Sequence, residues 1–201
     1  MKKTKSIFML SAVIMMSLWM VSCNHTQEQQ ADTMQPADTI VEETTPVSMW
    51  QTTVDEYLVE NIGKRLGVEK LLVVPYYTVF DVDSSDDNDY RVLGDWWVAG
   101  YDSDKDMLIT SLETCAPGLF HLQKTADGFI VKNFEEVQEG RAIEENAQRI
   151  FGKYCDAFWA AHDNQENKDS VRLAMMSEYV HRNNLPFTKL MLDSALPPVE
   201  L

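Results

Sequence analysis

The chain has 201 residues, with 17 basic and 32 acidic side chains and a formal net charge of −15. Such an acidic surface repels the phosphates of nucleic acids and of anionic lipid headgroups, so the composition argues against nucleic acid as a partner. About 155 residues beyond the polar amino-terminal region suit one domain with a single hydrophobic core.

The first 22 residues have the composition of an export signal. Residues 1–5 carry three lysines, residues 7–21 carry no charge, and the small Ser22 comes directly before Cys23. The uncharged run is shorter than the ~20 apolar residues of a bilayer-spanning helix and has the size of the apolar part of a signal peptide. We therefore predict a cleaved signal peptide over 1–22; an uncleaved anchor and ordinary secretion are the alternatives.

The residues around the predicted cleavage point resemble the lipobox of bacterial lipoproteins. Val21, Ser22 and Cys23 fit that motif, and Met20 stands where leucine is commoner. In this family the cysteine thiol is diacylglycerated, the chain is cut before it, and the new amino terminus usually receives a further fatty acid such as palmitate. The resemblance implies that Cys23 is lipidated and that the mature chain has the lipid bilayer as a partner, since two or three acyl chains hold a protein on a membrane durably.

The whole chain is also similar to uncharacterised envelope lipoproteins of Gram-negative bacteria. This resemblance rests on the lipobox and on a small α+β domain, and it implies no known activity. Asn24, directly after the cysteine, resembles the pattern of lipoproteins that travel to the outer membrane. The implied location is therefore the cell envelope, with a lipid anchor in the outer membrane and the domain on either its periplasmic or its surface side.

Residues 23–46 form the second predicted segment, a lipidated tether. Thr, Gln, Glu, Asp and Pro dominate it, so it has too little apolar surface to offset the entropy lost on ordering. A flexible chain of this length spans roughly 25 to 30 Å, which lifts a domain clear of the headgroups. The third segment, 47–201, is the predicted globular domain.

The domain opens with a predicted helix over 49–66. Ser48 and Gln51 have the spacing of a capping box, and Gly67 stands where a left-handed C-cap is wanted. Apolar residues recur between them at helical spacing. They are Trp50, Val54, Tyr57, Leu58, Ile62 and Leu66.

Five predicted strands follow, over 71–82, 90–101, 107–114, 119–124 and 129–134. They are rich in β-branched and aromatic residues, and the short turns between them favour antiparallel neighbours, with Asp127-Gly128 as the clearest hairpin signal. We therefore predict a meander of about five strands. Pro75 places the first strand at an edge of the sheet or at a bend.

After Gly140 the apolar period changes to about 3.6, which predicts carboxy-terminal helices. One stripe runs over 143–161 and is interrupted by Gly152, and a second begins near Asn167 or Asp169 and ends before Pro186. The predicted class is α+β, with these helices on one face of the antiparallel sheet. Over 49–136 the element order resembles the cystatin-like and NTF2-like folds.

One face of this predicted sheet collects the candidate ligand-binding residues. In the second strand the odd-numbered side chains share a face, and polar side chains of the fourth strand join them if the registers align. The candidates are Arg91, Asp95, Trp97, Tyr101, His121 and Gln123. Three interpretations stay open: a solvated face with Trp97 under the carboxy-terminal tail, a platform for a glycan or peptide, and catalysis by Asp95 and His121 as an acid–base pair.

Two further groups of residues bear on the chemistry. Cys115 and Cys155 are left as a pair once Cys23 is assigned to lipid, and they are either a disulfide in an oxidising compartment or two buried free thiols. Acidic turns, including Asp102 to Asp106, lack the glycine at the sixth position of a calcium loop; Met107 stands there instead. We predict no metal and no cofactor.

The expected function is that of an envelope lipoprotein whose domain binds a ligand or protein without catalysis. Its partner would be a glycan, a peptide or another envelope protein. The alternative is an envelope hydrolase that uses Asp95 and His121.

Overall fold

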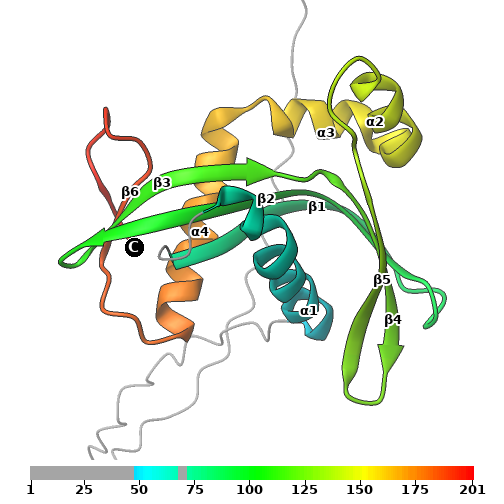
Figure 1. Cartoon of the computed structure of the whole chain (residues 1–201), viewed down its shortest axis with the longest axis horizontal. Helices are drawn as coiled ribbons and strands as arrows, with labels where there is room; N and C mark the ends of the chain where they lie inside the picture. The colour runs from blue at the N-terminus through cyan, green and yellow to red at the C-terminus, as the bar shows by residue number, and fades with distance from the viewer. Residues whose placement is uncertain (1–47, 68–71) are drawn as a thin grey trace, which may run out of the picture. The chain divides into compact units, whose positions relative to one another are not determined.

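The structure is a computed structural model that describes residues 48–67 and 72–201. The predicted signal peptide, Cys23 and the tether lie outside the described residues. Within these ranges the chain is α+β, as predicted, with a mixed seven-stranded sheet, one helix before it and further helices after it (Figure 1).

The predicted first helix is confirmed, although its geometry changes along its length. It consists of α1 (Met49–Tyr57), a π-helical turn η1 (Leu58–Ile62) and a 3₁₀ turn η2 (Gly63–Leu66). Gln51 Oε1 accepts a hydrogen bond from the Ser48 N–H at 2.8 Å, which is the glutamine half of the expected capping box. Gly67 ends the segment with a φ of 68°, the left-handed conformation that glycine adopts without strain.

All five predicted strands are present, and their ends differ from the predicted ends by at most three residues. They are β1 (Leu72–Asp83), β2 (Tyr90–Asp104), β3 (Met107–Cys115), β4 (Gly118–Thr125) and β5 (Gly128–Glu136). Their order is not a simple meander, because β4 pairs with β2 and not with β3. The physical reason is the length of β2: its second half pairs with β3, and after the turn at 116–117 its first half pairs with β4.

Strand β1 is an edge strand among the described residues, as Pro75 predicted, because it pairs with β2 alone. Pro75 lies opposite Val98 within the ladder. A proline has no N–H to donate, so it is tolerated where that side of the strand has no neighbouring strand.

Helices cover both faces of the sheet, which corrects the prediction of one covered face. The even-numbered side chains of β2 pack under α1, and the odd-numbered ones pack under the later helices; Figure 1 shows α1 and α4 on opposite sides of the sheet. Both layers are apolar, so each side of the sheet has its own core. The largest buried side chains of the α1 side are Trp96, Phe120, Leu58, Ile62 and Leu122.

The carboxy-terminal helices are α2 (Ile143–Phe151), α3 (Cys155–His162) and α4 (Gln165–Arg182). Gly152, with a φ of 52°, starts the 3₁₀ turn η3 (Gly152–Tyr154) and breaks the first predicted stripe into α2 and α3. Two short strands were not predicted, β6 (Lys189–Met191) and β7 (Val199–Glu200). Strand β6 pairs in parallel with β3, so the sheet is mixed.

Candidate functional site

The sheet face that carries the predicted ligand-binding residues is not an open platform. Asp95 and Tyr101 are each only 2% exposed, because the later helices pack on the odd-numbered residues of β2. Trp97 is half-buried, with the His162 ring 5.3 Å away and the Lys168 ammonium 4.5 Å above its indole. The covered face rules out both a solvated surface and a platform at Asp95 and Tyr101.

The predicted pair of Asp95 and His121 is wrong. Asp95 is instead paired with His162 of α3, whose Nδ1 lies 3.1 Å from both carboxylate oxygens. His121 lies opposite Arg91 in the ladder, and four residues of β2 place it ~13 Å from Asp95. Its ring nitrogens contact other carboxylates, Asp89 at 2.6 Å and Glu135 at 3.2 Å.

The remaining candidates also lie in separate local contacts. Arg91 pairs with Asp83 across the turn between β1 and β2. Gln123 faces Asn88, with 3.4 Å between the amide nitrogen and oxygen. The six predicted residues therefore do not form one site.

The two cysteines of the domain are both free thiols. Cys115 ends β3, and its pKa is raised to about 11, chiefly by burial and then by the negative charges of Asp95 and Glu139. A thiol with a raised pKa is a poor nucleophile, since the thiolate is the reactive form. Within residues 48–67 and 72–201, no three His, Cys, Asp or Glu side chains converge as metal ligands would.

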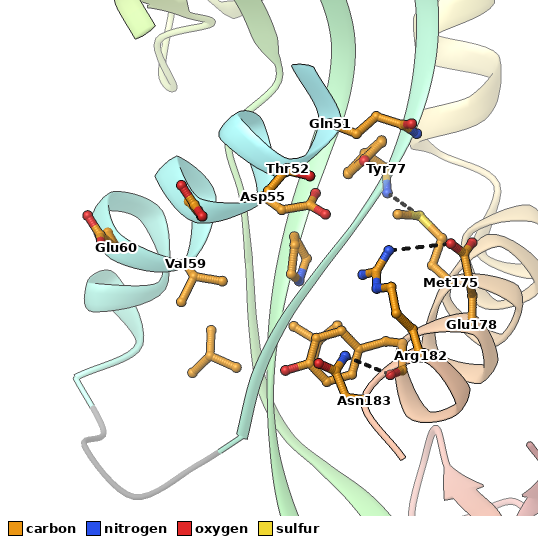
Figure 2. A pocket seen from close by; sticks show the side chains of 15 residues that line it. Gln51, Thr52, Asp55, Val59, Glu60, Tyr77, Met175, Glu178, Arg182 and Asn183 are labelled. Atoms are coloured by element: carbon orange, nitrogen blue, oxygen red, sulfur yellow. Dashed lines mark hydrogen bonds and ion pairs between the residues drawn. The ribbon is translucent and has the colours of Figure 1, made fainter. Parts of the chain in front are cut away.

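A groove with a cavity volume of about 580 Å³ lies elsewhere, between α1, the free edge of β1 and α4. Figure 2 shows Gln51, Thr52 and Asp55 of α1 facing Tyr77 of β1, with Met175, Glu178 and Arg182 of α4 on the opposite wall. The π-helical turn of residues 58–62 contributes Val59 and Glu60 to the rim. Such turns occur frequently at functional sites.

The floor of the groove is apolar, and the edge of β1 beside it has few free main-chain donors. Pro75 has no N–H, and the Tyr77 N–H on the same side of β1 donates to Met175 Sδ at 3.3 Å. Side chains of Val73, Met175 and Tyr179 complete the surface. An edge with so few free donors is a weak template for an added strand.

Asp55 is the group in this groove with the most unusual environment. Its Oδ1 atom is buried and has no hydrogen-bond partner among the described residues. Desolvation raises the pKa of Asp55 to about 6, although the Tyr77 hydroxyl and the charge of Arg182 each lower it. The carboxylate is therefore held where its charge is poorly compensated.

Two polar side chains, Gln51 and Tyr77, lie beside Asp55 in the groove. Gln51 Oε1 accepts from the Ser48 N–H at 2.8 Å, and the Gln51 amide lies close enough to the Tyr77 hydroxyl to lower its pKa. That hydroxyl is directed at the Asp55 carboxylate, and burial together with this negative charge raises the pKa of Tyr77 far above its ordinary value. Tyr77 is thus a donor at every physiological pH.

The rim of the groove is acidic. Among the described lining residues, Asp55, Glu56, Glu60 and Glu178 are carboxylates and Arg182 is the one cation. Arg182 Nη1 lies 3.4 Å from Glu178 Oε1, so part of its charge is already compensated. The groove therefore has a negative potential over an apolar floor.

Sequence reasoning missed this groove, although one signal was available. Gln51, Asp55 and Val59 recur every four residues, so they follow one flank of the apolar helix stripe. That flank faces α4, which is more than 100 residues away along the chain, and no local pattern indicates this neighbour.

No protein-family model, curated protein or solved structure matches the chain. Among the described residues, no helix combines the length and the apolar character needed to cross a bilayer.

Proposed function

We propose that the chain is an envelope lipoprotein, anchored through acylated Cys23, whose α+β domain binds a ligand in the groove between α1 and α4. The observation that carries this proposal is the buried, unpartnered Oδ1 of Asp55 in a cavity large enough for a small ligand. Buried polar atoms are nearly always hydrogen-bonded, and pockets with an apolar lining and few fixed polar groups are typical binding sites.

Binding without catalysis fits the chemistry of the groove. Its described lining residues include no His, Cys or Ser, so no cysteine or serine nucleophile paired with a histidine base stands beside Asp55. A single oriented carboxylate above an apolar floor supports recognition of a ligand.

Filling the groove tests the proposal. Val59 is partly buried at its wall, and Val59→Trp places an indole in the space, whereas Val82→Trp makes the same change at an exposed position of β1 outside the groove. Acylated protein purified from membranes would be analysed by native mass spectrometry for retained small molecules. We expect a ligand with the wild type and with Val82→Trp and its loss with Val59→Trp; equal retention by both variants would contradict the proposal.

A separate variant tests the anchor. Cys23→Ser removes the thiol that the acyl chain requires, so the protein is expected to leave the membrane fraction. Retention of Cys23→Ser in membranes, at the level of the wild type, would refute the lipid anchor without bearing on the groove.

A further inference from the structure

We propose that the ligand of the groove carries a protonated amine on an aliphatic stem, and that its ammonium group donates to Oδ1 of Asp55. This inference rests on the proposed binding function and specifies the chemical class of the ligand. Three properties of the groove support it: an acceptor without a donor, the sign of the local charge, and the apolar floor beside it.

The acceptor is the first property. Oδ1 of Asp55 is shut off from solvent, and no described side chain or main-chain N–H reaches it. The Tyr77 hydroxyl is already directed at the same carboxylate. Rotation of the carboxylate toward the groove would let one further donor, supplied by a ligand, complete the hydrogen bonding of this buried charge.

The negative charge around the groove favours a cationic donor over a neutral one. Among the described lining residues, four carboxylates face one guanidinium, and that guanidinium contacts Glu178. A negative potential of this kind concentrates cations and repels anions. A cationic donor to Asp55 therefore gains more than a neutral hydroxyl, because charge-assisted hydrogen bonds are the stronger ones.

The number of free oxygens favours an ammonium over a guanidinium. Guanidinium groups bind carboxylates best through two parallel hydrogen bonds to both oxygens. Of the two Asp55 oxygens, Oδ1 is the one buried without a partner among the described residues. A single ammonium N–H fits one acceptor.

The apolar floor of the groove is the reason to expect an aliphatic stem on the amine ligand. Pro75, Met175 and Tyr179 present apolar surface beside the carboxylate. Methylene groups of a lysine side chain or of an alkyl diamine pack on such surface while their charged end makes the polar contact. Because Pro75 and Tyr77 leave the edge of β1 with few free donors, recognition of the amine head does not depend on an added peptide strand.

Cadaverine and a capped lysine peptide are the probes that distinguish a free amine from a basic side chain, and 1,5-pentanediol is the neutral control of similar length. Binding to the acylated protein in a non-ionic detergent would be followed by calorimetry. We expect cadaverine, the lysine peptide or both to bind and the diol not to bind. Asp55→Asn should weaken amine binding about tenfold or more, since it removes the charge and keeps the shape.

Asp156→Asn is the matched control, because it makes the same change at an exposed position of α3 outside the groove, and we expect less than about a threefold effect. Circular dichroism and thermal unfolding would verify that each variant is folded. Equal amine affinity of Asp55→Asn and the wild type, or binding of the diol as tight as that of cadaverine, would overturn the inference. If the diol binds and Val59→Trp abolishes its binding, the groove still functions as a ligand site and only the amine class is refuted; amine binding that survives Val59→Trp would refute both.

Discussion

Nδ1 of His162 lies 3.1 Å from both carboxylate oxygens of Asp95, and this contact joins α3 to the middle of β2. The Asp95 side chain is only 3% exposed and that of His162 18%. A buried carboxylate without a partner is strongly unfavourable, so the contact with His162 stabilises the Asp95 carboxylate in its buried position under the helices.

Removal of His162 should therefore destabilise the fold. We expect His162→Ala to lower the free energy of unfolding by about 3 kcal/mol or more, because Asp95 would stay buried without its partner. His181→Ala is the control, since His181 is exposed on α4 and should change stability by less than about 0.5 kcal/mol. Urea unfolding measures both variants, and equal effects would show that the Asp95 contact has no special role.

Asp55 gives the fold a dependence on pH that runs opposite to that of an ordinary ion pair. Its pKa is about 6 in the fold and 3.8 as the reference value, so between these pH values the folded state holds a proton that the unfolded state has lost. Stability contributed by this group must then fall as pH rises from about 4 to 6, by at most about 3 kcal/mol, and stay constant above that range.

A comparison with Asp55→Asn isolates this effect. Burial is its main cause, and Tyr77, Arg182, Glu178 and Glu56 are the neighbours that modify it. We expect Asp55→Asn to be more stable than the wild type at pH 7.5 and the difference to shrink as pH falls toward 4. The comparison of the two proteins is needed because other carboxylates change the stability of both in the opposite direction with pH. Hydrogen bonds from Ser85, and then from Arg91, lower the pKa of Asp83 to about 2, so its contribution to stability is lost as the pH falls. A constant difference across this range would contradict the raised pKa.

Local signals in the sequence were sufficient to predict most of the secondary structure. Gln51 at its capping position, Gly67 at the helix end and the turn residues before β5 are all determined by near neighbours, and each was predicted correctly. Pro75 indicated the edge strand because a missing N–H is a property of that residue alone.

The site depended on contacts that no local pattern contains. Arg91 and His121 do lie in register on one face of the sheet, as the alternation predicted. Whether that face is exposed to solvent depends on where the later helices pack. Asp95 can be buried there because His162, 67 residues later in the chain, contacts its carboxylate. The burial of Asp95 and the groove beside Asp55 thus both depend on elements that are distant in the chain, and the alternation of β2 alone left the role of Asp95 open.

Cys115 should react slowly with alkylating agents. With a thiol pKa of about 11, its thiolate fraction at pH 8 is on the order of one in a thousand, far below that of an ordinary cysteine. We expect iodoacetamide to modify the Cys115 peptide at least about 100-fold more slowly in the native protein than in urea, as measured by mass spectrometry. Rapid native labelling, or a mass two hydrogens lower from a bond to Cys155, would contradict the free, protonated thiol.

Gly118 is a position in the sheet that leaves no room for a side chain. A Cβ atom there would lie 2.2 Å from the carbonyl oxygen of Glu135, across the pairing of β4 with β5. The Gly118 carbonyl also accepts a hydrogen bond from Trp96 Nε1 at 3.0 Å in the core under α1, so displacement of β4 would disturb that contact too. We expect Gly118→Ala to destabilise the fold by about 2 kcal/mol or more.

Gly67→Ala is the control that separates this steric effect from a general cost of replacing glycine. Gly67 has a φ of 68° and no described atom within 4 Å of an added Cβ, so its substitution should cost only the left-handed backbone, ~1 kcal/mol. Chemical unfolding of both variants would give the two values. If Gly118→Ala cost no more than Gly67→Ala, the close approach of β4 to β5 would not constrain the sheet.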